Sequence, residues 1–309
     1  MFDTVNFWIN RVDISSGNPF EILPFLSDVT ERQSEKGYDC IGSLINYTVY
    51  VSESGISLKG SLAKNHFGDN IHTLTRKDTQ RAIEELSDRL HIDVNLAKVT
   101  RLDVSTILYT KRQPSDYYRY LGQKPYFKRL DAVKDETLYY LNHQRQIIFY
   151  DKKREAIKKG VQIPEILQNA NLLRYELRYM KGINRQLNDD VKAGKLYTRP
   201  FYDDVIRNWG DEFKTIQKLK KQSIMMDDIT TVKDAEMALF AFALNQLGQS
   251  TIDEFLDDLK AANKFSDRQR YYELKKRLQT IASTYEFHEK NELMQEIESQ
   301  AFNIARYAR

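Results

Sequence analysis

The clearest alternation of apolar and polar residues runs over residues 171–181, "NLLRYELRYMK". One row of alternate positions is apolar: Leu173, Tyr175, Leu177 and Tyr179. The other row carries three charges: Leu172, Arg174, Glu176, Arg178 and Met180. Successive side chains of a strand point to opposite faces of a sheet. The segment is therefore predicted to be a strand with one packing face and one charged face.

Similar patterns predict mixed α and β structure for the part of the chain before Gly182. Five further segments have the pattern of strands: 45–51, 56–62, 97–110, 136–142 and 145–152. A turn at 52–55 joins the first two. Apolar positions at helical spacing predict a helix over 75–92, and a shorter helix is expected over 154–160.

Beyond Gly182 the chain shows successive helical patterns, separated by Gly, Asn–Lys and Ser–Thr positions that end helices. These patterns cover four segments: 234–248, 251–263, 267–284 and 290–309. Three residues are candidate helix caps: Thr231, Thr251 and Ser266. We therefore expect an α+β fold, with a largely antiparallel sheet and flanking helices over 1–190, followed by an all-helical region over 191–309.

The composition is that of a globular protein with a core, because 41% of the 309 residues are hydrophobic and 29% are charged. No uninterrupted apolar run approaches the ~20 residues that span a bilayer. The first residues also lack the pattern of a secretory signal. One cysteine, Cys40, rules out an internal disulfide and fits a reducing compartment. A cytoplasmic protein is therefore expected.

The net charge of +3 permits a nucleic-acid partner without arguing for one. Cations are concentrated in residues 111–129: Lys111, Arg112, Arg119, Lys124, Lys128 and Arg129. Aromatic residues alternate with them: Tyr117, Tyr118, Tyr120, Tyr126 and Phe127. This mixture is typical of a groove that binds single-stranded DNA. A solvated basic surface whose tyrosines cover the core explains the composition equally well.

Three strands in succession carry polar side chains on one face. Arg101 and Asp103 share a face of the first, and Arg174, Glu176 and Arg178 share a face of the last. The strand between them ends at Tyr150 and continues into two further charges: Lys152 and Glu155. If the three faces align in one sheet, these charges require mutual pairing, a metal ion or an anionic ligand. A purely structural network of ion pairs is the alternative.

The order of these motifs resembles a known family. The segments are "SLAKNHFGDN", "TRLDVSTIL", "IIFYDKKRE" and "LLRYELRYMK". Over about residues 40–182, their succession resembles the replication initiation proteins of the filamentous-phage gene II/X family. It is more distantly similar to the rolling-circle initiators of small staphylococcal-type plasmids. The resemblance implies a nickase- or relaxase-like fold in the cytoplasm of a bacterial host.

Such proteins nick one DNA strand at an origin and become covalently attached to the 5′ phosphate. By this resemblance Tyr150 is the nucleophile, and Asp103, Glu176 and Glu155 are ligands of Mg²⁺ or Mn²⁺. The basic positions of the motifs are Arg101, Lys152, Arg174 and Arg178, and Lys64 lies in the upstream segment. A phosphodiester needs a positioned nucleophile and neutralisation of its charge, and these residue types supply both.

Several functions stay open. A relaxase-like nickase for conjugative transfer would use the same chemistry, whereas an origin-binding regulatory protein or an unrelated α+β binding module would use none. There is no His-x-His pair and no G-x-x-x-x-G-K-[ST] motif, so a two-histidine metal site and a helicase motor are not expected. The helical region has three possible partners: duplex DNA, a host helicase or a second copy of the chain. Its basic segment 267–279 either lies along phosphates or is a solvated face.

Overall fold

The computed structural model describes residues 1–34, 37–131, 136–219, 223–224, 229–284, 287–288 and 291–307. The chain forms two compact units. The first unit combines Met1–Lys218 with Leu293–Arg309, and the second unit is Leu219–Glu292. The compact units therefore divide the chain at other places than the predicted boundary at 190/191. The reason is that one helix before the second unit in the sequence (Arg199–Lys214) and one helix after it (Glu292–Tyr307) both pack in the core of the first unit.

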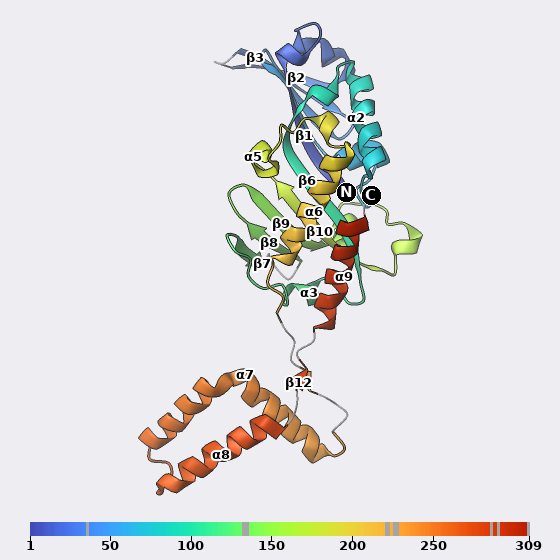
Figure 1. The fold of residues 1–309 in the computed structure, drawn as a ribbon. Coiled ribbons are helices and arrows are strands. Elements are labelled where there is room, and N and C mark those ends of the chain that lie inside the picture. Colours follow the sequence, from blue (N-terminus) through green and yellow to red (C-terminus); the bar gives the residue numbers. More distant parts are fainter. Residues whose placement is uncertain are drawn as a thin grey trace. The chain divides into compact units, whose positions relative to one another are not determined.

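A single ten-stranded sheet organises the first unit, and all of its strand pairs are antiparallel (Figure 1). Its order is β2-β3-β4-β5-β1-β6-β10-β9-β8-β7. The strands are β1 (Phe2–Asn10), β2 (Ser27–Ser34), β3 (Gly37–Leu44), β4 (Tyr47–Ser52), β5 (Gly55–Lys59), β6 (Lys98–Thr110), β7 (Lys128–Asp131), β8 (Thr137–Leu141), β9 (Arg145–Asp151) and β10 (Asn171–Tyr179). The predicted α+β class with a largely antiparallel sheet is confirmed.

Helices surround this sheet. The α-helices are α1 (Leu62–Phe67), α2 (Arg76–Leu90), α3 (Ser115–Tyr118), α4 (Lys152–Lys158), α5 (Ile183–Leu187), α6 (Arg199–Lys214) and α9 (Glu292–Tyr307). Short 3-10 helices are η1 (Arg11–Asp13), η2 (Pro19–Phe25), η3 (Val94–Leu96), η5 (Glu165–Leu167) and η6 (Ala193–Lys195). Thr75 begins α2 with a capping box to Asp78. The predicted strand 56–62 is too long, because the Ser61 hydroxyl accepts a hydrogen bond from the Lys64 N–H and caps α1.

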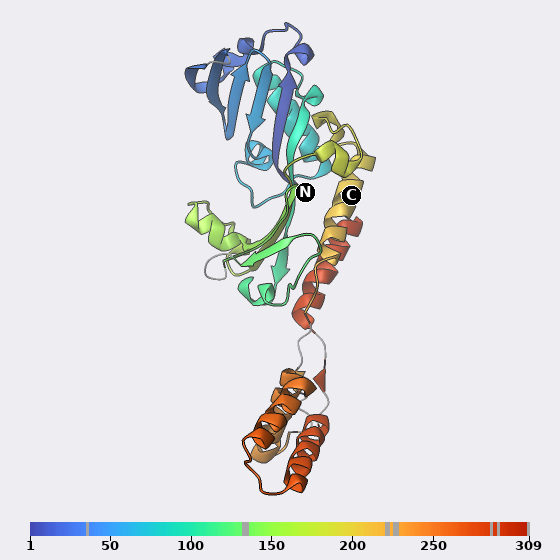
Figure 2. The ribbon, with the colours of Figure 1, turned by 90° about the vertical axis from the view of Figure 1, so that its left-hand side faces the viewer.

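The two faces of β10 differ as the sequence predicts. On the apolar face, Tyr175 stacks on Phe149 with ring centroids 4.8 Å apart and donates a hydrogen bond to the Trp209 carbonyl at 3.0 Å. Trp209 belongs to α6, which lies with α9 on one side of this half of the sheet, whereas α4 lies on the other side (Figure 2). The α9 residues Met294 and Ile297 are buried in the same core. The charged face of β10 is thereby directed toward α4.

The second unit is mainly helical, as predicted. It contains α7 (Val232–Ala261), α8 (Arg268–Thr284) and a short ladder of β11 (Ser223–Ile224) with β12 (Phe287–His288), which was not predicted. Gly248 has a left-handed, non-helical backbone and divides α7 between the two predicted helical segments. Thr231 caps α7 with Asp234, and the Asp267 carboxylate, rather than Ser266, binds an N–H at the start of α8. Residue 290 and residues 308–309 of the predicted last helix lie outside the described residues.

None of the helices in the described parts of the chain combines the length and apolar character that a membrane span requires.

Candidate active site

The polar faces of β6, β9 and β10 align, so the condition set in the sequence analysis is met. In the sheet register, Arg178 pairs with Asp103 and Glu176 pairs with Ser105 on β6, while Arg174 pairs with Tyr150 on β9. Directly opposed residues of neighbouring strands share a face. The three charged segments therefore form one continuous polar surface.

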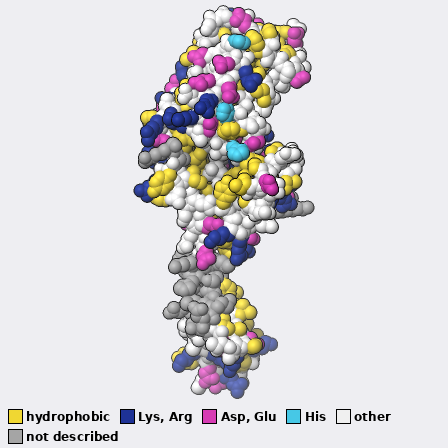
Figure 3. Space-filling model, turned by 90° about the vertical axis from the view of Figure 1, so that its right-hand side faces the viewer, with side chains coloured by type: hydrophobic (Ala, Val, Ile, Leu, Met, Phe, Trp, Pro, Cys, Tyr) yellow, Lys and Arg dark blue, Asp and Glu magenta, His cyan; other side chains and the backbone are white. Residues whose placement is uncertain are grey.

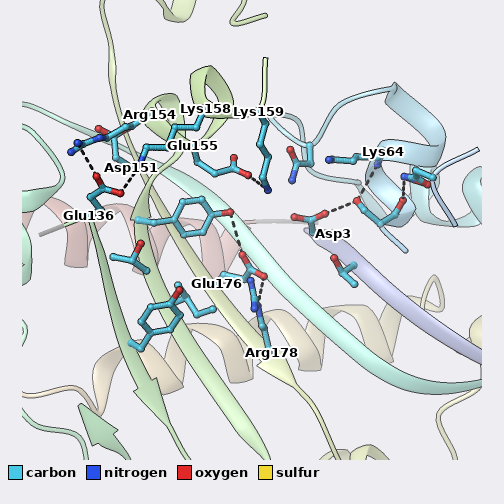
Figure 4. A pocket seen from close by; sticks show the side chains of 18 residues that line it. Asp3, Lys64, Glu136, Asp151, Arg154, Glu155, Lys158, Lys159, Glu176 and Arg178 are labelled. Atoms are coloured by element: carbon cyan, nitrogen blue, oxygen red, sulfur yellow. Dashed lines mark hydrogen bonds and ion pairs between the residues drawn. The ribbon is translucent and has the colours of Figure 1, made fainter. Parts of the chain in front are cut away.

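A cavity of about 530 Å³ opens on this surface. Figure 4 shows acidic and basic side chains pointing toward one another across it, with Asp3 and Glu176 on one side and Lys159 and Glu155 on the other. Its charged lining residues are Asp3, Lys64, Glu136, Asp151, Arg154, Glu155, Lys158, Lys159, Glu176 and Arg178. We call it the catalytic cavity, because a catalytic function is proposed for it. Tyr150 lies in its wall.

The Tyr150 hydroxyl donates a hydrogen bond to Glu176 Oε2 at 3.3 Å. Burial raises the pKa of Tyr150 well above its ordinary value, and the carboxylates of Glu176, Asp3 and Glu155 raise it further, against the opposing charge of Arg174. The phenol is therefore protonated at neutral pH. Its proton is directed at a carboxylate oxygen of Glu176.

Glu176 is 3% exposed and accepts a hydrogen bond from Arg178 Nε at 2.7 Å on its other oxygen. Burial alone would raise the pKa of Glu176, but the charges of Arg178 and Arg174 hold it below its ordinary value. The carboxylate beside the phenol is therefore ionised and available as a proton acceptor.

Arg174 is fully buried, and its guanidinium joins three elements. Nη2 donates to Asp3 Oδ2 at 2.7 Å and to Ser105 Oγ at 2.6 Å, and Nη1 donates to the Asn70 carbonyl at 2.8 Å. Asp3 also accepts a hydrogen bond from the Ser61 hydroxyl at 2.7 Å. The charge of Arg174 is thus committed to the scaffold of the cavity, because this side chain does not line it.

Asp3 is a buried acidic residue of the site that the sequence analysis missed. It is 3% exposed, lies on β1 and faces the cavity, while its ion-pair partner Arg174 is 171 positions away in the chain. A signal existed, since Asp3 is the one charged residue in "MFDTVNFWIN", a segment whose other residues are apolar or uncharged polar. A buried charge of this kind needs a partner, and the partner could not be read from local pattern.

Asp103 lies behind the cavity and does not line it. It is fully buried, and Arg101 donates to both of its oxygens, at 2.9 and 2.6 Å. Arg178 Nε is 3.5 Å from the same carboxylate and therefore bridges Asp103 and Glu176. Burial raises the pKa of Asp103 to about 7, with Arg101 opposing the shift and Glu176 adding to it.

Lys152 and Glu155 form a pair at the start of α4. Lys152 Nζ donates to Glu155 Oε2 at 2.7 Å and to Asn70 Oδ1 at 2.7 Å, and the side chain is 1% exposed. Glu155 is also paired with Lys159. Because Lys152 is enclosed and Asn70 is held by both Lys152 and Arg174, these two cations fix the loop that carries Asn70.

The neighbours of the carboxylates determine which of them could bind a metal ion. Within the described residues, no three His, Cys, Asp or Glu side chains lie close enough together to hold a metal ion. Of the predicted ligands, Asp103 is held by Arg101 and Glu155 by two lysines. Among the acids that line the cavity, the buried ones are Asp3 and Glu176, and each of these is paired with an arginine. Two hard oxygen donors of this kind, completed by substrate phosphate, suit Mg²⁺ or Mn²⁺.

The seven predicted DNA-binding residues do not form one surface around the catalytic cavity. Lys64 lines the catalytic cavity. The other six do not: Lys111, Arg112, Arg119, Lys124, Lys128 and Arg129. Lys124 is 5% exposed and paired with Glu212 at 2.8 Å, and Arg129 donates to the Leu121 and Tyr118 carbonyls. Within this segment, Lys124 and Arg129 therefore serve internal contacts in the structure.

Three other cations rim the cavity instead. Arg154, Lys158 and Lys159 come from α4 and the residue after it, and each is more than half exposed. The sequence carries a signal for them in "DKKREAIKKG", a dense run of cations directly after Tyr150. A helix that places cations at the mouth of a cavity provides a surface for phosphate groups.

These features define an α+β protein whose antiparallel sheet carries, on its polar face, a cation-rimmed cavity suited to a phosphate ester. A family model for the N-terminal part of the phage gene II replication-associated protein matches residues 1–206. The chain belongs to this family, the filamentous-phage gene II-type replication initiators. The match confirms the resemblance and extends it to the N-terminal strand that carries Asp3. No curated protein is significantly similar to the chain.

Proposed function

We propose that this replication initiator is a site-specific enzyme that nicks and rejoins DNA at a replication origin, with Tyr150 as its nucleophile. The observation that carries the proposal is the hydrogen bond from the Tyr150 hydroxyl to the ionised Glu176 inside a cavity rimmed by cations. The family match favours a replication origin over an origin of conjugative transfer as the substrate.

In the proposed reaction, the phenol oxygen of Tyr150 attacks the scissile phosphorus while its proton passes to Glu176. An Oη–P bond forms, the bond between phosphorus and the 3′ oxygen breaks, and the leaving oxygen takes a proton from water. The product is a 5′-phosphotyrosine and a free 3′ hydroxyl. Because one phosphate ester replaces another, a 3′ hydroxyl can reverse the attack and rejoin the strand without an added energy source.

The cations have two separate roles in this proposal. Arg178 holds Glu176 ionised and in place, and Arg174 fixes Asp3 and the wall of the cavity. Lys64, Lys159 and the exposed cations of α4 face the opening, where they neutralise the charge of the bound phosphate. Arg101 and Lys152 act through Asp103 and Asn70, so they position other groups rather than touch DNA.

We further propose that Mg²⁺ or Mn²⁺ assists the reaction. Asp3 and Glu176 would hold the ion together with the substrate phosphate, and each would have to share its carboxylate with its present arginine partner, Arg174 or Arg178. Asp103 and Glu155 would likewise contribute only if they left their own ion pairs. The ion would withdraw charge from the phosphoryl oxygens.

The test uses supercoiled DNA of the replicon that encodes the protein, with Mg²⁺, with Mn²⁺ or with EDTA. The wild-type protein should yield nicked circles with protein on the 5′ end, and mass spectrometry should find the phosphodeoxynucleotide on the peptide that contains Tyr150. Tyr150→Phe should abolish both products. Tyr139→Phe is the matched control, because Tyr139 lines the same cavity.

Normal nicking by Tyr150→Phe, or loss of nicking by Tyr139→Phe alone, would contradict the nucleophile assignment. Glu176→Gln should bind the DNA and fail to cleave it; full cleavage by this variant would remove the proposed proton acceptor. DNA binding without cleavage by the wild-type protein under all metal conditions would favour the non-catalytic, origin-binding function. The predicted roles of the C-terminal helices toward duplex DNA, a host helicase or a second copy stay predictions.

A further inference from the structure

A second cavity of about 520 Å³ lies next to the catalytic cavity. Its lining residues are Phe67, Ile71, His72, Thr73, Thr106, Ile107 and Tyr109. We call it the aromatic cavity. Three of its residues are substantially exposed: Phe67 at 38%, Tyr109 at 53% and the His72 side chain at 57%. On the face drawn in Figure 3, apolar and histidine side chains gather around a hollow in the surface.

Strand β6 runs from the scaffold behind the catalytic cavity to the aromatic cavity. Ser105 binds Arg174 in the scaffold of the catalytic cavity, and Ile107 and Tyr109 follow at alternate positions on the same face. Alternate residues of a strand are separated by roughly 7 Å along its axis. The aromatic cavity therefore begins within about one nucleotide's reach of the catalytic scaffold.

Consecutive residues of one loop line the two cavities. Asn70 lines the catalytic cavity, and the next two residues, Ile71 and His72, line the aromatic cavity. Arg174 binds the Asn70 carbonyl and Lys152 binds the Asn70 side chain, each through a buried cation. Two basic positions of the nicking motifs thus hold the loop that lines both a charged cavity and an aromatic one.

The chemistry of the aromatic cavity differs from that of its neighbour. Its described lining residues include no Lys, Arg, Asp or Glu, so no permanently charged side chain there pairs with a phosphate. Phe67 contacts the rings of His66 and His72, with centroids 4.7 and 5.9 Å away, and thereby extends an aromatic surface. Thr73, Thr106 and His72 add a few polar groups at the edge. Aromatic faces with sparse hydrogen-bonding groups match an unstacked nucleobase.

We propose that the aromatic cavity binds one unstacked base of the DNA strand whose phosphate enters the catalytic cavity. The position of this base next to the scissile phosphate rests on the proposed function. The choice of a base as the ligand rests on the aromatic lining of the cavity. A base held there orients the neighbouring phosphodiester toward Tyr150, and it requires the origin to be single-stranded or melted at that nucleotide. The structure thus assigns part of the substrate preference to Phe67 and Tyr109.

The experiment measures binding, so that it does not depend on cleavage. A fluorescently labelled dT12 oligonucleotide and a set of dT12 molecules with one abasic nucleotide at successive positions are titrated against the Tyr150→Phe protein. Fluorescence anisotropy gives each dissociation constant. Because stacking on an aromatic side chain changes affinity by roughly 5- to 150-fold, at least one abasic position should weaken binding by that factor.

The variant Phe67→Leu/Tyr109→Ser in the same background should bind dT12 more weakly and lose its sensitivity to that abasic position. Tyr109→Phe alone keeps an aromatic face and should retain the sensitivity. Tyr50→Ser is the matched control, because Tyr50 is 37% exposed and lies on β4, away from both cavities. Tryptophan-fluorescence melting of each variant verifies that it is folded.

No measurable binding of dT12, no sensitive abasic position, or equal sensitivity in the folded Phe67→Leu/Tyr109→Ser variant would each overturn the proposal. An abasic position that weakens binding to the Tyr150→Phe protein but not to this variant supports the aromatic cavity as a base-binding site. If the wild-type protein also forms no tyrosine adduct, only the proposed nicking function fails. Loss of sensitivity in the Tyr50→Ser control would also count against the aromatic cavity.

Discussion

Asp3→Asn should destabilise the first unit strongly, because it removes the negative charge opposite the fully buried Arg174. Breaking a buried ion pair by removing one partner costs about 3–5 kcal/mol. The remaining bonds from Arg174 to Ser105 and Asn70 favour the lower part of this range. For a domain of this size, each 1 kcal/mol lowers the midpoint of thermal unfolding by about 2–4 °C, so a fall of roughly 6–20 °C is expected.

Tryptophan fluorescence is the suitable assay. Trp8 is on β1 and Trp209 is on α6, so both tryptophans of the chain report on the first unit. Melting of the helical second unit therefore does not enter the signal, and a two-state treatment of the first unit can be checked by itself. The surface control is Asp204→Asn, because Asp204 and Arg207 are both more than 60% exposed in their ion pair. This control should change the midpoint by less than about 2 °C.

The charge-free double variant Asp3→Asn/Arg174→Met gives the sharper result. Replacing both members of a buried pair by uncharged groups is often neutral or stabilising. The double variant should therefore be more stable than Asp3→Asn alone. A midpoint shift below about 2 °C for the single variant, or a double variant that is no more stable than the single one, would refute the account of the Arg174 scaffold.

Three further predictions concern stability, each measured by urea denaturation with tryptophan fluorescence. Gly210→Ala should destabilise by about 1–3 kcal/mol, because the added Cβ would meet the Ala305 Cβ at 2.6 Å, and Ala305→Gly should restore most of the loss. Burial lowers the pKa of Lys218 to about 8 in the folded protein. Above about pH 8 the unfolded chain therefore binds more protons than the folded chain, and the free energy of unfolding should rise between about pH 8 and 9.5. Lys218→Met should remove this rise. Thr75→Ala should cost about 1 kcal/mol by opening the capping box of α2, and an unchanged midpoint would exclude that role.

The alternation along β10 predicted both faces correctly, because the period of a strand is a local property of the sequence. The alignment of the three polar faces, which the sequence analysis took as a condition, is present in the structure. Local alternation could not predict which acids line the cavity. Asp103 and Glu176 share a sheet face, yet Arg101 holds Asp103 behind the cavity, and Asp3 takes the place beside Tyr150. Such a choice depends on contacts across the whole chain.

Contacts between distant parts of the chain also decide the roles of the basic segment 111–129 and of the C-terminal helices, and the sequence does not show these contacts. Composition could not show that Lys124 pairs with Glu212, a residue on α6 that is 88 positions away. The helix over 290–309 was recognised by its apolar spacing, but its packing partner was not. Amphipathic spacing shows that a helix needs a covered side, and it leaves open which part of the protein covers it.

The return of α9 to the first unit has a practical consequence for shortened versions of the protein. The family match ends at residue 206, whereas the core of the first unit also contains Met294, Ile297 and Ala301. A chain cut at the family boundary would expose the surface that these residues cover and would also lose the hydrogen bonds between Gln300 and the Tyr109 backbone. An internal deletion of 219–292, bridged by a short linker, would keep all of them and is the truncation that preserves a complete folding unit.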